Sequence, residues 1–397
     1  MTPRRGSDPD SAVAARYDGR LVIVDLIREM GSATRTQLAT RAGYSSSSVT
    51  SLVAGLLEDG VIEETDLVGK GRGSGSGRPA RRLRYVGSGA HVAGIDFGHA
   101  HLSVAVADAS GQILRTARSE IDVDIHAEEA LDRAAATLRE LESDLGLDGV
   151  ASVVVGVPGP IDRNTGELTS PSILASWVGL RPREELVRRL GVPVHVENDA
   201  VLGAYGEGRR GAGERSDDFL YVKVSHGIGA ALMLGGQPYR GATGLAGEIG
   251  HTKVPGRTEL CRCGERGCIE AAVSTGAVRD QLVHTHRGVM NEVVPLTFAA
   301  DPATSRLMQE TGRTLGWLFS TLCNLVNPSA LIIGGELGIA HPGIIDGVRE
   351  ALERHAQPAI MASLDVVPAE LGESAELVGA VLMAAERQAR VGAMSAR

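Results

Sequence analysis

Two different spacings of apolar positions divide this chain of 397 residues. In the first part, apolar residues recur every three or four positions, which predicts short helices. Beyond Ser88, short apolar runs alternate with longer helical patterns, which predicts an α/β body. We therefore expect a disordered tail at residues 1–16, a helical head at 17–86 and a two-lobed body at 87–397. One lobe would span about 87–200 and include the C-terminal helix, and the other would span about 201–375.

Three short helices and two strands are expected in the head. The first helix runs from Leu21 to Met30 and stops at Gly31. A capping box of Thr34 and Gln37 opens the second, which Gly43 ends. Ser45 or Ser46 caps the third, whose inner face is apolar at Val49, Leu52, Val53, Leu56 and Leu57.

This order of helices is typical of a helix-turn-helix, with the third helix as the recognition helix. Strands at 61–64 and 83–86 would flank a glycine-rich, basic tip at 69–79, which describes a wing. The alternative is an ordinary three-helix bundle with a flexible loop. The residues expected to contact DNA are Arg35, Ser46, Ser47, Ser48, Thr50, Ser51, Lys70, Arg72 and Arg78.

Charge separates the head from the body. The net charge of the whole chain is −9, but basic residues are in excess within 1–84, so the head can meet phosphates although the body is acidic. The alternative for the basic segment is a solvated linker. No apolar run approaches the roughly 20 residues needed to cross a bilayer, and the N-terminus does not resemble a secretory signal, so we expect a cytoplasmic protein without membrane contact.

Glycine turns follow three predicted strands of the body. They lie at Asp96 to Gly98, at Gly227 to Gly229 and at Gly334-Gly335. Backbone amides in such turns can form a nest for phosphate, although each turn alone could be a simple hairpin. Two of the turns belong to similar strand-turn-strand units, at 91–108 and 219–234, which indicates duplicated lobes. Between these units, Glu197-Asn198-Asp199 ends a strand at 192–196, where α/β sheets place ligands.

A histidine and three of the four cysteines have the spacing of a metal site. His251, Cys261, Cys263 and Cys268 offer the imidazole and three thiolates of a closed tetrahedral zinc site. The alternative is three free thiols in a loop. Zinc would hold Glu248 and Glu270 in fixed positions, where their carboxylates could bind a polyhydroxylated ligand; otherwise both are solvated surface charges.

With these motifs, the chain resembles the ROK family of repressors and sugar kinases. The resemblance covers the helix-turn-helix, 94–98, 156–160, 197–199, 248–251 and the cysteine loop. It implies a winged helix-turn-helix joined to a two-lobed actin-like (ribonuclease H-like) sugar kinase fold. It also implies sugar contacts from Asn198, Asp199, Glu248, His251 and Glu270, zinc on His251 and the cysteines, and Asp199 as the base of any kinase activity.

The phosphate half of the expected site departs from the family kinases. There the first phosphate loop continues with a second glycine and a threonine, whereas here Gly98 is followed by His99-Ala100-His101. His226 replaces the threonine that precedes the second glycine pair. We therefore expect poor binding of ATP and Mg²⁺ at Asp96, Gly98, Gly227, Gly229, Gly334 and Gly335.

The sequence thus predicts a sugar-responsive transcription regulator that acts as a repressor and uses zinc structurally. It would be a homodimer or homotetramer bound to an inverted repeat in double-stranded DNA. Two alternatives stay open: an active, glucokinase-like ATP-dependent sugar kinase with an accessory DNA-binding head, and a DNA-binding protein whose body serves only for assembly. The residues leave open which sugar or sugar phosphate is bound.

Overall fold

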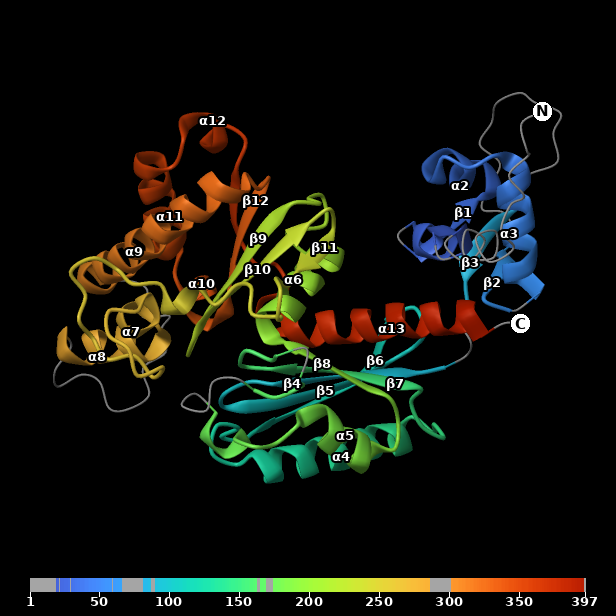
Figure 1. Cartoon of the computed structure of the whole chain (residues 1–397), viewed down its shortest axis with the longest axis horizontal. Helices are drawn as coiled ribbons and strands as arrows, with labels where there is room; N and C mark the ends of the chain where they lie inside the picture. The colour runs from blue at the N-terminus through green and yellow to red at the C-terminus, as the bar shows by residue number, and fades with distance from the viewer. Residues whose placement is uncertain are drawn as a thin grey trace, which may run out of the picture.

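A computed structural model describes residues 19–20, 22–28, 30–58, 60–65, 81–86, 90–162, 165–168, 174–285 and 301–395. The head stands beside one end of the long helix α13, and the two lobes of the body lie along the rest of it (Figure 1). The tail at 1–16 and the wing residues Lys70, Arg72 and Arg78 lie outside the described residues. In the described part, no helix is both long enough and apolar enough to cross a bilayer.

The head is a winged helix-turn-helix. Residues 22–28 form its first helix, followed by α2 (Arg35–Ala42) and α3 (Ser46–Glu58). Strands β1 (Ala33–Thr34), β2 (Ile62–Thr65) and β3 (Arg82–Tyr85) form a sheet in the order β1-β3-β2. The sequence predicted β2 and β3 within one residue, but not the two-residue β1.

Local signals in the head act as expected. The capping box is present, because Thr34 Oγ1 accepts from Gln37 N at 3.3 Å and Gln37 Oε1 accepts from Thr34 N at 2.9 Å. Gly43 ends α2 with φ of +67°. Ser45 caps α3, since its Oγ accepts from Ser48 N at 3.1 Å. The four apolar residues Val49, Leu52, Val53 and Leu56 are buried, whereas Leu57 is only partly buried.

The two lobes have the same sheet architecture. Lobe one has the strand order β6-β5-β4-β7-β8, and lobe two has β11-β10-β9-β12-β13. In each lobe the first three strands are antiparallel neighbours and the last two are added in parallel. The predicted duplication is therefore confirmed at the level of topology. The strands are β4 (Val92–Phe97), β5 (His101–Ala107), β6 (Ile113–Glu120), β7 (Ser152–Val157), β8 (Val194–Asn198), β9 (Phe219–Val224), β10 (Ile228–Leu234), β11 (Gln237–Tyr239), β12 (Ala330–Gly334) and β13 (Asp365–Pro368).

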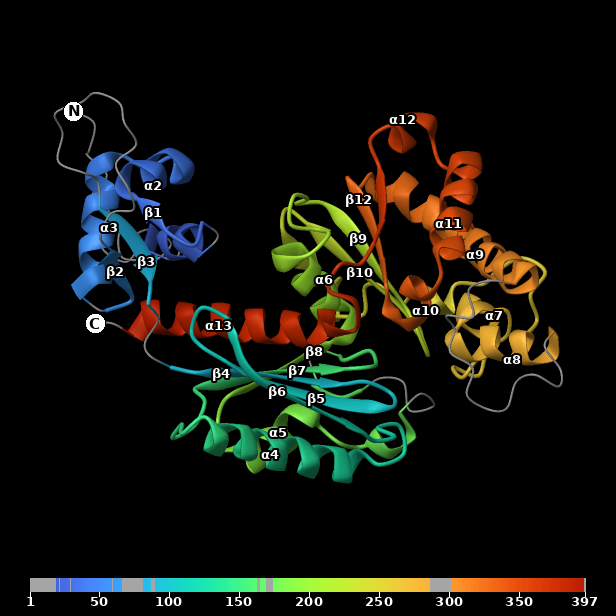
Figure 2. The same cartoon turned by 180° about the vertical axis from the view of Figure 1, so that it is seen from behind.

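Helices cover the outer face of each sheet. In lobe one, α4 (Ala127–Asp144) and α5 (Pro182–Leu190) pack below the sheet, as the reverse view shows (Figure 2). In lobe two, α9 (Pro302–Val326) and α11 (Pro342–His355) pack against each other and the sheet. Shorter segments complete this lobe: α7 (Ile269–Val273), α8 (Thr275–Thr285), α10 (Gly335–Ala340) and α12 (Pro358–Met361). Short 3₁₀ turns occur at Ala175–Trp177, Ile249–His251 and Gly372–Ser374.

Two helices lie between the sheets and share one core with both. They are α6 (Asp199–Arg210) and α13 (Ala375–Ser395). The pair meets backbone to backbone: a Cβ on Gly379 would lie 1.9 Å from Leu202 O, and one on Gly206 would lie 2.5 Å from Ala375 O. The sequence predicted a C-terminal helix, as α13 confirms, but not α6, which begins directly at the end of β8.

Candidate functional site

A cavity of about 490 Å³ opens between the two lobes. It collects the predicted residues from distant parts of the chain, and the lining also includes cations and carboxylates that the sequence did not single out. The predicted residues that line it are Gly98, Asn198, Asp199, Gly227, Gly229, Glu248, His251, Glu270 and Gly335. Asp96 and Gly334 do not line the cavity, and Asp96 is buried behind it.

The junction of β8 and α6 places the first two polar groups. Asn198 caps α6, because its Oδ1 accepts from Val201 N at 3.3 Å, and its Nδ2 donates to Gly159 O at 3.2 Å. Asp199 is the first residue of α6, where the helix dipole favours a carboxylate. Both side chains therefore have fixed orientations at the cavity wall before any ligand binds.

Two glutamates form the facing wall. Glu270 Oε2 accepts from Ile228 N at 3.0 Å, which fixes its carboxylate beside the glycine turn of β10. Burial, followed by the charges of Asp199 and Glu270, raises the pKa of Glu248 to about 7. Glu248 can therefore donate as well as accept a hydrogen bond near neutral pH, which suits a wall that contacts hydroxyl groups.

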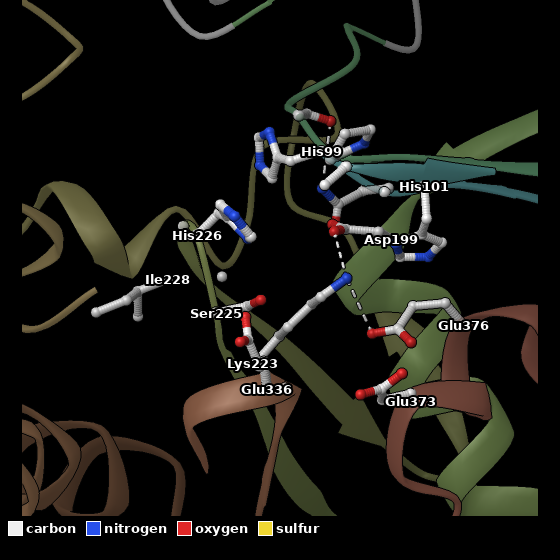
Figure 3. A pocket seen from close by; sticks show the side chains of 18 of the residues that line it. His99, His101, Asp199, Lys223, Ser225, His226, Ile228, Glu336, Glu373 and Glu376 are labelled. Atoms are coloured by element: carbon white, nitrogen blue, oxygen red, sulfur yellow. Dashed lines mark hydrogen bonds and ion pairs between the residues drawn. The ribbon is translucent and has the colours of Figure 1, made fainter. Parts of the chain in front are cut away.

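Lys223 also lines the cavity and was not among the predicted site residues. Its Nζ lies 2.8 Å from Asp199 Oδ2 and 3.1 Å from Glu376 Oε1, as Figure 3 shows. Burial alone would lower the pKa of Lys223, but Asp199, Glu376 and Asp96 raise it well above its usual value. Asp199, which the family resemblance implies as the base of any kinase activity, is thus already paired with a cation. A lysine inside the apolar strand Phe219–Val224 was the available sequence signal, because such a lysine needs buried partners.

Imidazoles fill the phosphate side of the cavity. His101 Nε2 lies 3.0 Å from Asp96 Oδ2, and its ring covers the first glycine turn so closely that a Cβ on Gly98 would lie 2.2 Å from His101 Cε1. His99 Nδ1 bonds Asp124 Oδ1 at 2.7 Å, and the ring centroids of His99 and His226 are 5.6 Å apart (Figure 3). The imidazoles of the chain therefore lie at the glycine turns where the sequence predicted a nest for phosphate.

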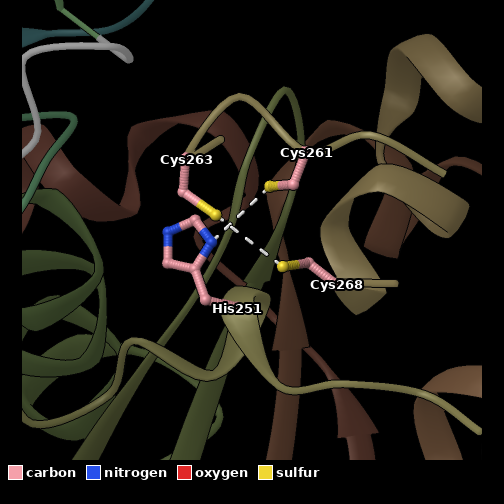
Figure 4. A group of neighbouring side chains, drawn as sticks. All are labelled: His251, Cys261, Cys263 and Cys268. Carbon is pink, nitrogen blue, oxygen red and sulfur yellow. Dashed lines mark hydrogen bonds between the residues drawn. The ribbon is translucent and has the colours of Figure 1, made fainter. Parts of the chain in front are cut away.

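The predicted metal ligands converge as expected. The ligand atoms of His251, Cys261, Cys263 and Cys268 all lie within 4.8 Å of one another (Figure 4). Cys263 Sγ and Cys268 Sγ are 3.8 Å apart, and Cys261 Sγ is 3.7 Å from His251 Nδ1. Thiolates at about 2.3 Å from a tetrahedral zinc are themselves about 3.8 Å apart, so this donor set fits zinc.

The cluster is also linked to the cavity wall. His251 directs Nδ1 toward Cys261 and has Nε2 3.9 Å from Glu248 Oε2. Cys261 Sγ lies 3.8 Å from Glu270 Oε1. If His251 binds a metal, Glu248 near its other ring nitrogen would be the outer partner that orients the imidazole, as is usual for metal-bound histidines. The arrangement joins the metal cluster to both glutamates of the wall.

The described residues expected to contact DNA lie on α3, apart from Arg35, which is the first residue of α2. The predicted contact residues on α3, Ser46, Ser47, Ser48, Thr50 and Ser51, are all exposed. Arg35 is less available than expected, because its Nη2 bonds Glu64 Oε1 at 2.8 Å. Glu64 also pairs with Arg81, so these three residues link α2 to β2 and to the residue before β3.

A kinase-like cleft between duplicated lobes, with a winged helix-turn-helix attached, defines the class of this protein: a two-lobed sugar-kinase fold joined to a DNA-binding head. Residues 92–387 match the model of the ROK family, and the chain belongs to that family.

Transcription regulators match this chain almost end to end. The xylose repressor of Bacillus spizizenii is 27% identical over 379 residues, covering 93% of this chain and 95% of that protein. The DNA-binding transcriptional dual regulator NagC of Escherichia coli is 27% identical, covering 94% of this chain and 93% of that protein. The structure of a ROK family transcriptional regulator, a homologue of the E. coli MLC protein, superposes with a TM-score of 0.79 at 23% identity, covering 96% and 98% of the two chains.

The body alone also matches a kinase. A ROK family glucokinase from Streptomyces griseus, solved with glucose and AMPPNP, superposes with a TM-score of 0.65 at 29% identity. The match covers 74% of this chain and 99% of that one. The predicted fold class is therefore confirmed.

Proposed function

We propose that this chain is a DNA-binding transcription regulator, acting as a repressor, whose affinity for its operator changes when a sugar binds between the lobes. The observation that carries the proposal is the pairing of Asp199 with Lys223 in a chain that also presents an exposed polar recognition helix. A general base needs access to the proton of the sugar hydroxyl, and here the Lys223 ammonium already bonds the Asp199 carboxylate, which supports a sugar sensor over a kinase.

The sugar would bind to Asn198, Asp199, Glu248, His251 and Glu270. These side chains offer mostly acceptor atoms in fixed positions, which suits a ligand with several hydroxyl groups. A cavity of about 490 Å³ is in the range of small-molecule sites. The full-length relatives named above support a regulator of carbohydrate metabolism genes.

Zinc would have a structural role in this proposal. A bound ion would supply a rigid centre that fixes His251 and, through the adjacent contacts, Glu248 and Glu270. With three thiolates and one imidazole the coordination is closed, which leaves no position for substrate.

Two experiments test the proposal. Full-length, zinc-loaded protein would select fragments from a random double-stranded DNA library, and fluorescence anisotropy would measure affinity for the enriched sequence with and without D-xylose, D-glucose, N-acetylglucosamine and its 6-phosphate. We expect an inverted repeat, and a change of affinity with at least one sugar. No enrichment over the variant lacking residues 1–86 would contradict DNA binding.

An active sugar kinase is the second candidate, because the carboxylates of the sugar side are present and the glucokinase body superposes. A coupled assay for ADP release with the same sugars separates the two functions. We expect no turnover above background, since Lys223 bonds Asp199, the candidate base, and the ring of His101 covers Gly98 in the candidate phosphate nest. Turnover at typical kinase rates, abolished by Asp199→Asn, would establish the kinase instead.

A further inference from the structure

One ammonium group joins the first turns of two helices that come from distant parts of the chain. Asp199 is the first residue of α6, and Glu376 is the second residue of α13. Lys223, on β9 of lobe two, bonds both carboxylates. All three side chains are largely buried, with 13%, 5% and 17% of the Asp199, Glu376 and Lys223 side chains exposed.

From this junction the two helices run as one packed unit. The absent side chains of Gly206 and Gly379 let the backbones touch. Glu207, which is fully buried on α6, accepts from Glu370 N at 3.2 Å and from Leu371 N at 2.8 Å in the segment that leads into α13. We expect a displacement of one helix at Lys223 to reach the other, because close-packed interiors transmit strain.

The far ends of both helices reach the head. Ala389 of α13 belongs to the buried core of the head. A second cavity, of about 540 Å³, is lined by Asp25 and Arg28 of the head, by Arg209 of α6 and by Glu386 of α13, among others. Arg209 and Glu386 lie 4.0 Å apart across the two helix ends. Figure 1 shows α13 running from the region between the two lobes to the head.

We propose that Lys223 is the positioning residue that couples the sugar site to the DNA-binding head through the α6–α13 pair. The inference rests on the proposed function and names the path of its regulation. A sugar hydroxyl bonded to Asp199 competes with Lys223 for the same carboxylate, which shifts the first turn of α6 relative to β9. The 12 residues of α6 and 21 of α13 extend that shift over about 18 and 31 Å.

The buried triad of Asp199, Lys223 and Glu376 is not explained by a gain in stability alone. Replacing a buried ion pair by apolar groups of similar size is often neutral or stabilising, because removing the charges from water costs so much. A charged junction is more useful for a switch, since its geometry changes when a polar ligand shares one partner. The position of the triad, on the cavity wall and at the start of both helices, fits that use.

Hydrogen exchange measured by mass spectrometry tests the coupling without knowledge of the sugar or the operator. The samples are zinc-loaded full-length protein, Lys223→Met, Glu376→Gln and the control Arg279→Met. Arg279 is a suitable control because it lines the same cavity but pairs with Glu336 on α10, at 3.0 Å, away from α6 and α13.

Both triad variants should exchange at least about fivefold faster than wild type in the first turns of α6 and α13 and also at residues 22–28 of the head, a factor at the lower end of allosteric couplings. Arg279→Met should match wild type in the head. If the first turns loosen while residues 22–28 stay unchanged, Lys223 is only a local contact and the inference is wrong. Should Lys223→Met not fold, Glu376→Gln, which keeps the bond from Lys223 to Asp199, decides the question alone.

A second measurement separates this inference from the proposed function. Anisotropy on the enriched DNA fragment should show about a fivefold change of affinity in Lys223→Met relative to Arg279→Met. If the protein binds no DNA but the variants show coupled exchange, the coupling through Lys223 stands and the proposed DNA-binding function is wrong. Normal DNA affinity in both variants together with uncoupled exchange would reject the path while the function stands.

Discussion

The contact between α6 and α13 gives the sharpest test of the body's packing. In Gly379→Ala, the new methyl carbon would lie 1.9 Å from Leu202 O and 3.0 Å from Gly206 N, both backbone atoms. Neither atom can rotate away as a side chain would, so the two helices must separate by more than about 1 Å to restore an ordinary contact.

The magnitude follows from two opposing effects. Forcing an extra carbon into a packed core costs about 1–3 kcal/mol, or more where backbone must shift. Alanine regains up to about 1 kcal/mol in a helix interior relative to glycine. We therefore expect a net loss of about 2 kcal/mol, which lowers the melting temperature by about 2–3 °C in a chain of this size.

Differential scanning fluorimetry and urea unfolding of the full chain provide the measurement. Gly276→Ala is the matched control, since it lies in α8 with no heavy atom within 4 Å of the new Cβ. It should leave stability unchanged or raise it by up to about 1 kcal/mol. If Gly379→Ala proved as stable as Gly276→Ala, the close approach of the two helices described here would be incorrect.

Three further predictions concern the metal, pH and DNA. Cys263→Ser should lose the bound metal, measured by elemental analysis, and lower the melting temperature, whereas Cys323→Ala should keep the metal; equal metal content in both would refute the assigned ligands. Burial, followed by nearby positive groups, lowers the pKa of His226, so stability should fall as pH drops from about 7.5 to 5.5 because the unfolded chain binds the proton first. His226→Gln should lose less stability over this pH range than wild type, and an equal loss in both proteins would contradict the prediction. Ser51→Glu on α3 should weaken DNA binding at least about tenfold without changing stability, whereas Thr116→Glu on β6 of the body should have little effect on binding; equal loss in both would exclude α3 as the recognition helix.

Local signals explain why so much of the head and of the positions of its strands could be predicted. A capping box at Thr34, a left-handed glycine at Gly43 and an apolar face on α3 each depend on residues close in sequence. The metal cluster was similarly readable, because three of its four ligands fall within eight residues. Segments without such signals were missed: α6 starts without a break after β8, and its small residues resemble a loop although they allow close packing.

The ion pairs and hydrogen bonds among the side chains of the cavity could not be predicted from the sequence in the same way. Lys223 and Glu376 are 153 positions apart, and only the fold brings their charges within 3.1 Å of each other. The imidazoles were recognised as a departure from family kinases, but not that His101 would bond Asp96 and cover Gly98. Contacts of this kind depend on tertiary packing, which a single sequence encodes only through the need of each buried charge for a partner.

The placement of α13 has a consequence for how the chain is made. This helix leaves the ribosome after every strand it covers, yet it supplies the core between the lobes and a buried residue, Ala389, for the head at the opposite end of the chain. Until α13 has been synthesised, one apolar face of the lobe-one sheet therefore lacks the helix that covers it. The core of the head is complete only when translation has passed Ala389, so chains that stop earlier would lack this contact between head and body.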